Sequence, residues 1–269
     1  MGDAVIAFSG GADSSFLLKI ASDTLPEERL LAVTAVSDTY TRSELKQAKR
    51  FARALGVRHK LIFTKEMKDR NFIKNPPDRC YYCKKELFNR LRDIAKRGNF
   101  KFILDASNED DKKDYRPGNR AKKEFLVRSP LQEVHITKDE IKRYSKTLRL
   151  KTWSLPPMPC LASRVPYGEK ISGAKLKKIQ KAEDFIRHSG ITLARVRHHG
   201  DIARIEVEKK DIKRFFNRNF CDKIIKYIKK LGFGYVALDL EGYRTGSLNE
   251  GLKRRRSFGA YNAPVCRIA

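Results

Sequence analysis

Short apolar runs alternate with amphipathic segments through the first part of the chain. Each run is flanked by polar residues or glycine, which is typical of buried strands in a parallel sheet. The apolar runs predict strands over residues 4–8 and 30–36, and further strands are predicted over 59–63 and 102–106. Apolar residues at helical spacing predict helices from Asp13 onward and over 42–56, 84–97 and 137–148. This alternation of strands and helices implies right-handed crossovers and a parallel sheet, so the first part of the chain is predicted to have an α/β fold.

The connections between these elements differ in character. Residues 21–29 are polar, contain a proline and are predicted to form a loop, whereas 64–79 is predicted to be irregular. Thr137 and Glu140 have the spacing of a capping box at the start of their helix. Sheets of this kind bind ligands beyond the carboxyl ends of their strands, which is where the segment after residue 8 lies.

A proline-rich stretch, Leu155-Pro156-Pro157-Met158-Pro159-Cys160, separates this pattern from another. Such a stretch is extended and typical of a linker. The elements predicted beyond it are a basic helix over 174–188, an alternating run over 192–207, a basic helix over 209–231 and a strand over 235–240. We therefore expect a parallel-sheet domain over 1–155, a linker over 156–171 that carries Cys160, and a smaller C-terminal α+β domain over 172–269 for substrate binding or oligomerisation.

A glycine-rich segment, SGGADSS at residues 9–15, joins the first strand to the first helix. A turn without Cβ atoms beside a helix N-terminus forms a cradle of N–H groups and hydroxyls that suits a phosphate. The segment lacks the lysine of a GxxxxGK[ST] P-loop. Its letters SGGxDS resemble the pyrophosphate-binding loop of the PP-loop ATP pyrophosphatases, which split ATP between the α- and β-phosphates and adenylate a substrate. The predicted nucleotide-binding residues are Ser9, Gly10, Gly11, Asp13 (near Mg²⁺), Ser14 and Ser15.

The composition indicates an anionic partner. Lys and Arg number 59 against 32 Asp and Glu, a formal net charge of +27, to which a basic run at 253–256 contributes. Nucleic acid, small anionic substrates and a thermophile's charged surface compete as explanations, and the excess is too large for thermal adaptation alone. No signal peptide precedes the first strand, and no apolar stretch approaches the ~20 residues that span a bilayer. We expect a cytoplasmic protein that does not enter a membrane.

The five cysteines argue against a disulfide framework in a chain of this kind. Cys80 and Cys83 form a CxxC pair, and Cys160 stands in the predicted linker. A zinc ribbon would need a second CxxC, which Cys221 and Cys266 do not form, and we expect these two to be inert thiols. A thioredoxin-like pair does not fit an ATP loop. Three thiolates could hold a [4Fe–4S] cluster with one iron open to an exogenous ligand such as sulfide.

Four longer strings carry a more specific resemblance. They are Cys160-Leu161-Ala162-Ser163-Arg164-Val165-Pro166-Tyr167-Gly168, Arg195-Val196-Arg197-His198-His199-Gly200-Asp201-Ile202-Ala203-Arg204-Ile205-Glu206, Asp114-Tyr115-Arg116-Pro117-Gly118 and Arg128-Ser129-Pro130-Leu131. With the ATP loop they resemble the LarE family, the sulfur-inserting synthases of the nickel-pincer nucleotide cofactor, from the loop to Asn249. The resemblance implies a PP-loop (adenine nucleotide alpha hydrolase-like) domain, a smaller second domain and a homo-oligomer.

The resemblance also implies a reaction. ATP and Mg²⁺ would adenylate a carboxylate of pyridinium-3,5-biscarboxylic acid mononucleotide, sulfur would displace AMP, and a second round would give the bisthiocarboxylic product. In family members with one cysteine, the residue that matches Cys160 gives up its own sulfur. In members with three, the residues that match Cys80, Cys83 and Cys160 bind a [4Fe–4S] cluster. This chain has all three, which favours the cluster, with inorganic sulfide or another sulfur donor as the source.

Substrate-binding residues follow from the same resemblance. Arg195 and Arg197 alternate on a predicted strand, so their side chains point the same way and suit a phosphate clamp. Ser163 and Arg164, just after Cys160, would hold the nucleotide end of the substrate near the sulfur.

Four other residues have less specific roles. Glu183 and Glu206 match functional acids of the family and would orient groups or manage protons. His198 and His199 are neighbours on the predicted strand and face opposite sides, so we expect a structural or substrate role for one of them.

Other functions compete with this interpretation. A PP-loop tRNA thiolase shares the ATP loop and often the three-cysteine cluster, and the charge of +27 would suit RNA. The missing second CxxC and the strings at 160–168 and 195–206 favour the LarE family instead. An amide-forming synthetase would give the CxxC pair no task, and a non-catalytic RNA-binding protein would not need an intact SGGxDS loop.

Overall fold

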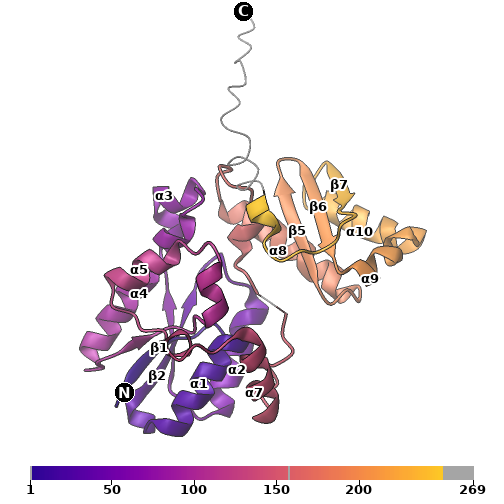
Figure 1. Ribbon diagram of the computed structural model, residues 1–269. Helices are drawn as coiled ribbons and strands as arrows, with labels where there is room; N and C mark the ends of the chain where they lie inside the picture. Colours follow the sequence, from indigo (N-terminus) through magenta and orange to yellow (C-terminus); the bar gives the residue numbers. More distant parts are fainter. Residues whose placement is uncertain (1, 157, 251–269) are drawn as a thin grey trace, which may run out of the picture. The chain divides into compact units, whose positions relative to one another are not determined.

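The structure is a computed structural model that describes residues 2–156 and 158–250 (Figure 1). The chain forms two compact units, Met1–Gln180 and Lys181–Ala269, whose boundary falls inside helix α8 (Gly173–His188). The basic run at 253–256 and Cys266 lie outside the described residues. Within the described part of the chain, no helix has the length and apolar composition needed to cross a bilayer.

The first unit contains a parallel sheet with the strand order β3-β2-β1-β4. Its strands are β1 (Ala4–Ala7), β2 (Leu30–Val36), β3 (His59–Phe63) and β4 (Ile103–Leu104). Every pairing is parallel, which confirms the predicted α/β fold. β4 is shorter than the predicted 102–106 because its pairing with β1 covers only Ile103 and Leu104, and Asp105 N then donates to Arg128 O.

Helices cover both faces of this sheet (Figure 1). The helices on one face are α1 (Ala12–Thr24), α2 (Arg42–Ala54) and α7 (Lys138–Thr147), and those on the other are α4 (Arg79–Arg97) and α5 (Gly118–Glu124). Successive strand residues point to opposite faces, so Ile6 lies in the first core and Val5 in the second. The predicted capping box of α7, Thr137 with Glu140, is confirmed.

The loop predicted over 21–29 is partly helical, which corrects the prediction. α1 continues to Thr24 because Ala21 is buried in the core, and because the hydroxyls of Ser22 and Thr24 donate to carbonyls one turn back. The irregular segment predicted over 64–79 contains the short helix α3 (Arg70–Ile73). A further short helix, α6 (Pro130–Glu133), follows the paired segment at Arg128.

The start of α4 is a second correction. The sequence predicts a helix over 84–97 that follows the CxxC pair, whereas α4 begins at Arg79. Cys80 and Cys83 therefore lie within the first turns of a helix, on a rigid element.

The second unit contains a sheet with the order β5-β6-β7. β5 (Ala194–His199) and β6 (Ile202–Val207) form an antiparallel hairpin, and β7 (Tyr235–Leu238) runs parallel to β6. The single helix predicted over 209–231 is wrong. α9 (Lys209–Ile212) and α10 (Arg218–Lys230) are separate, because Asn217 caps α10 by accepting a hydrogen bond from Phe220 N at 3.0 Å.

Candidate functional site

The SGGxDS loop lies at the carboxyl end of β1, where α/β sheets bind their ligands. Gly10 has a φ of +77°, and a Cβ on it would lie 3.0 Å from the Cα and Cβ of Ala48 on α2. Ser14 Oγ donates to Gly11 O at 3.1 Å and lies 3.0 Å from Ser9 Oγ, which closes the loop. Gly10 is therefore required both by the left-handed backbone and by the close approach of α2.

Asp13, in the first turn of α1, lies in a buried polar corner. Asn108 Nδ2 donates to Asp13 Oδ2 at 3.1 Å, and Asn108 is itself buried and caps a 3-10 turn together with Asp111. Burial and the carboxylate of Asp111 raise the pKa of Asp13. The sequence analysis missed Asn108 and Asp111, because a polar stretch after a strand has no periodicity that distinguishes one residue from its neighbours.

Replacement of Asp13 by asparagine is expected to stabilise the fold at neutral pH. When folding raises the pKa of a carboxyl, the folded state is destabilised at a pH above the raised pKa, where the group must ionise in a buried place. Below the ordinary pKa of 3.8 the group is protonated in both states and has no effect on stability. The variant should therefore exceed wild type in free energy of unfolding at about pH 7 and approach it toward about pH 4, while ATP-dependent pyrophosphate release falls. Urea unfolding measures this, with Asp23→Asn, an exposed position on the same helix, as the control. A less stable variant at neutral pH would contradict the expectation.

The three cysteines predicted as ligands all lie in the first unit. Cys160 directly precedes a 3-10 turn (Leu161–Arg164) and is half-buried, as is Cys83. Cys80 is exposed as a residue, but burial of its thiol and the neighbouring Cys160 thiol raise its pKa. Burial, the Glu66 carboxylate and the Cys160 thiol raise the pKa of Cys83. The thiols therefore lie within electrostatic range of one another.

The three thiols do not form a site for a single metal ion, and their role as cluster ligands stays a prediction. Among the described residues, no three ligating side chains stand close enough to hold one metal ion. In an iron–sulfur cluster each thiolate binds a different iron, so the sulfurs do not have to converge on a common point. Cys221 lies on α10, in the second unit.

Arg164 is buried and turned toward the segment that carries Cys160. Its Nη1 donates to Pro159 O at 2.5 Å, to Cys160 O at 3.1 Å and to Ser163 Oγ at 3.0 Å. The guanidinium thus organises the turn around Cys160, and the nucleotide contact expected of Ser163 and Arg164 stays a prediction.

The second unit buries Arg195, Arg197 and Glu206 together on its hairpin. Arg197 makes a bidentate pair with Glu206, with Nε to Oε1 at 3.0 Å and Nη2 to Oε2 at 2.7 Å. Arg204 Nη2 approaches Oε1 of the same carboxylate at 3.1 Å. The guanidinium of Arg197, which the sequence analysis assigned to a phosphate, therefore binds the carboxylate of Glu206 in this structure.

Glu183 connects two elements of the same unit. It is fully buried on α8, and its Oε1 accepts a hydrogen bond from Val196 N at 3.1 Å. His198 is buried against Phe233 and His199 is exposed, which confirms that the two histidines face opposite sides.

Replacement of Glu206 by glutamine is expected to lower the free energy of unfolding by about 2–3 kcal/mol. The variant keeps the shape of the side chain but removes the buried carboxylate charge that Arg197 Nη2 and Arg204 Nη2 approach at 2.7 and 3.1 Å. Asp222→Asn is the matched control, because Asp222 faces Arg218 at 3.9 Å on the exposed surface of α10 and its pair should contribute less than about 1 kcal/mol. Urea unfolding compares the two, and equal losses would show that the buried pair does not stabilise the unit.

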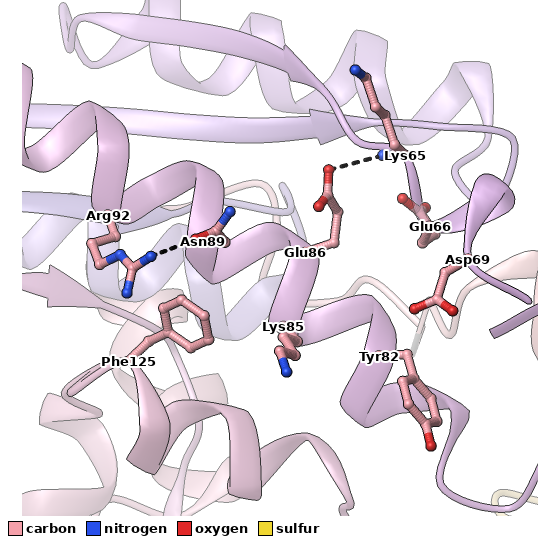
Figure 2. Close-up of a pocket in the computed structure, with 9 residues that line it drawn as sticks. All are labelled: Lys65, Glu66, Asp69, Tyr82, Lys85, Glu86, Asn89, Arg92 and Phe125. Atoms are coloured by element: carbon pink, nitrogen blue, oxygen red, sulfur yellow. Dashed lines mark hydrogen bonds between the residues drawn. The ribbon is translucent and has the colours of Figure 1, made fainter. Parts of the chain in front are cut away.

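A hollow of about 400 Å³ lies beside α4 in the first unit (Figure 2). Its walls come from the segment after β3, from one face of α4 and from the residue that follows α5, with charges of both signs: Lys65, Glu66, Asp69, Tyr82, Lys85, Glu86, Asn89, Arg92 and Phe125. None of the predicted site residues is among these wall residues, so the loop and the cysteines do not open into this hollow.

The parallel sheet with an SGGxDS loop at the end of β1 defines an α/β enzyme of the ATP-using PP-loop class. In agreement, the family model described as asparagine synthase matches residues 3–93. Pyridinium-3,5-bisthiocarboxylic acid mononucleotide synthase of Lactiplantibacillus plantarum is 36% identical over 249 residues, which cover 93% of this chain and 90% of that protein. The chain belongs to the family of this synthase, the LarE family, and is an ATP-dependent sulfurtransferase.

Two further relatives match over nearly the same length. An uncharacterized protein of Synechocystis sp. is 41% identical over 251 residues, 93% of each chain. An uncharacterized protein of Methanocaldococcus jannaschii is 34% identical over 244 residues, 90% of each chain. The likeness therefore spans both structural units and not the ATP loop alone.

Proposed function

We propose that the protein adenylates the carboxylates of pyridinium-3,5-biscarboxylic acid mononucleotide and converts them to thiocarboxylates. The observation that supports this best is the presence of the SGGxDS loop and of three thiols, those of Cys80, Cys83 and Cys160, in one structural unit. A carboxylate oxygen is a poor leaving group and AMP a good one, so ATP is consumed before sulfur enters.

The ATP half of the reaction is assigned to the loop. The proposed pyrophosphate-binding residues are Ser9, Gly10, Gly11, Ser14 and Ser15. Ser15 Oγ is buried and has no hydrogen-bond partner in the described part of the chain, so it is available to a phosphate oxygen. Asp13 is proposed to lie near Mg²⁺. The charge of the ion would favour the ionised carboxylate, which burial disfavours.

The sulfur half is assigned to Cys80, Cys83 and Cys160, as ligands of a [4Fe–4S] cluster. A cluster held by three thiolates leaves one iron open to an exogenous ligand such as sulfide. The surroundings of Cys83 favour its protonated thiol. An iron ion bound in place of the proton would favour the thiolate instead. Without a cluster, Cys160 would donate its own sulfur once.

The remaining predicted residues are proposed to hold the substrate, with the arginines on its anionic groups and the acids as orienting groups. They are Ser163, Arg164, Arg195 and Arg197, and Glu183 and Glu206. Arg164 and Arg197 already have oxygen acceptors. Substrate binding would therefore exchange hydrogen bonds at these guanidinium groups.

An anaerobic assay with ATP, Mg²⁺, the biscarboxylic mononucleotide and sulfide tests the proposal. We expect pyrophosphate release and, by mass spectrometry, replacement of one oxygen of each carboxylate by sulfur. Cys160→Ala should still release pyrophosphate but form no thiocarboxylate, whereas Cys221→Ala, on the other unit, should match wild type. Turnover that requires tRNA in place of the mononucleotide would overturn the proposal and favour a tRNA thiolase.

A further inference from the structure

A buried polar network in the first unit holds the turn that follows Cys160. Asn75 is fully buried and has a φ of +55°. Its Nδ2 donates to Val165 O at 3.2 Å and to Pro166 O at 2.7 Å, and its main-chain carbonyl accepts a hydrogen bond from Gly168 N at 2.9 Å. One residue therefore fixes three points of the segment 165–168.

The same side chain also contacts the start of α4. Asn75 Oδ1 accepts a hydrogen bond from Arg79 Nη1 at 2.8 Å, and Arg79 directly precedes Cys80. The guanidinium is buried, and its carbon lies 4.7 Å from the ring centre of Tyr167. Asn75 thus connects the two segments that carry the three thiols.

The charge of Arg79 is unusual for its surroundings. In the described part of the chain, no carboxylate pairs with Arg79, and its buried Nε has no acceptor. Burial of a guanidinium is costly without a counter-charge. Thiolates at the adjacent cysteines would supply that negative charge, so the network suits a loaded thiolate site.

We propose that Asn75 is a positioning residue that holds Cys160 in place relative to Cys80 and Cys83, with Arg79 as the buried cation of the site. This inference rests on the three-thiol site of the proposed function. An amide is needed because it donates to two carbonyls and accepts from the guanidinium at once, and asparagine also tolerates a positive φ. Aspartate would keep the acceptor and lose the donors, and glycine would keep only the backbone.

Anaerobic reconstitution with iron and sulfide measures whether the three thiols are held in place for a cluster. We expect wild type to acquire about four irons per chain and absorption near ~400 nm. Asn75→Asp should acquire at least about tenfold less iron under the same conditions, because its carboxylate would face two carbonyl oxygens.

A matched control separates this role from backbone strain. Asn99 has a φ of +53° and is exposed in the turn after α4, so Asn99→Asp makes the same change outside the network and should acquire iron like wild type. Asn75→Gly provides a second test if Asn75→Asp does not fold, with ATP-dependent pyrophosphate release as the check on the rest of the unit. Wild-type iron content in a folded Asn75 variant would overturn the positioning role. Failure of wild type itself to acquire iron would overturn the three-thiol site instead.

Discussion

Substitution of Gly10 by alanine is expected to lower ATP-dependent pyrophosphate release by about 100- to 1,000-fold, the typical effect of losing an oriented donor at a developing charge. A Cβ at this position would lie 3.0 Å from the Cα and Cβ of Ala48, which is fully buried in the core. Gln47 Nε2 additionally donates to Gly10 O at 2.5 Å. Since α2 is fixed by its packing, the loop itself must move, and its N–H groups would no longer converge on the phosphates.

Gly56→Ala is the matched control for this prediction. Gly56 follows α2 with a φ of +68°, and a Cβ on it would meet nothing within 4 Å. Both variants lose about 1–2 kcal/mol to the left-handed backbone, so both should be less stable in urea. Only Gly10→Ala should also lose pyrophosphate release. Equal activities of the two variants would show that this loop does not hold the phosphates.

The parallel sheet and its ATP loop could be predicted because their signals are local. β2 is a mostly apolar run bounded by polar residues, and both β2 and β3 match their predicted residues. The N-terminus of α7 could be predicted because Thr137 and Glu140 make their capping contacts within one helical turn. Each of these signals lies within a few consecutive residues, although the strands themselves pair with distant ones.

The hydrogen bonds of the candidate site could not be predicted, because its partners lie far apart in the chain. The alternation of residues along the strand predicts that Arg195 and Arg197 share a face. The register of the hairpin adds Glu206 to that face, directly opposite Arg195 and within reach of Arg197, which binds its carboxylate. Asn75 and Asn108 lie in segments without periodicity, and their roles become visible only when residues about 90 positions away meet them.

Replacement of Cys83 by alanine is expected to abolish the iron and the absorption near ~400 nm that wild type acquires on anaerobic reconstitution, about four irons per chain. Cys80 and Cys83 lie three residues apart on α4, and Cys160 lies in a separate segment close enough for its thiol to raise the pKa of Cys83. Loss of Cys83 leaves two thiols, too few to hold the cluster. Cys221→Ala removes a thiol of similar exposure from the other unit and should keep the iron and the band.

The same pair of variants distinguishes the two sulfur routes. With a cluster, Cys83→Ala should release pyrophosphate and form no thiocarboxylate, because the protein no longer carries an exogenous sulfur. If wild type takes up no iron, the cluster route is contradicted and Cys160 becomes the donor. Cys83→Ala would then complete one turnover like wild type, and mass spectrometry would find one sulfur missing at Cys160 in both proteins. Sulfur lost from Cys160 in iron-loaded wild type would contradict a catalytic cluster as well, because a carrier of exogenous sulfide leaves the thiol of Cys160 intact.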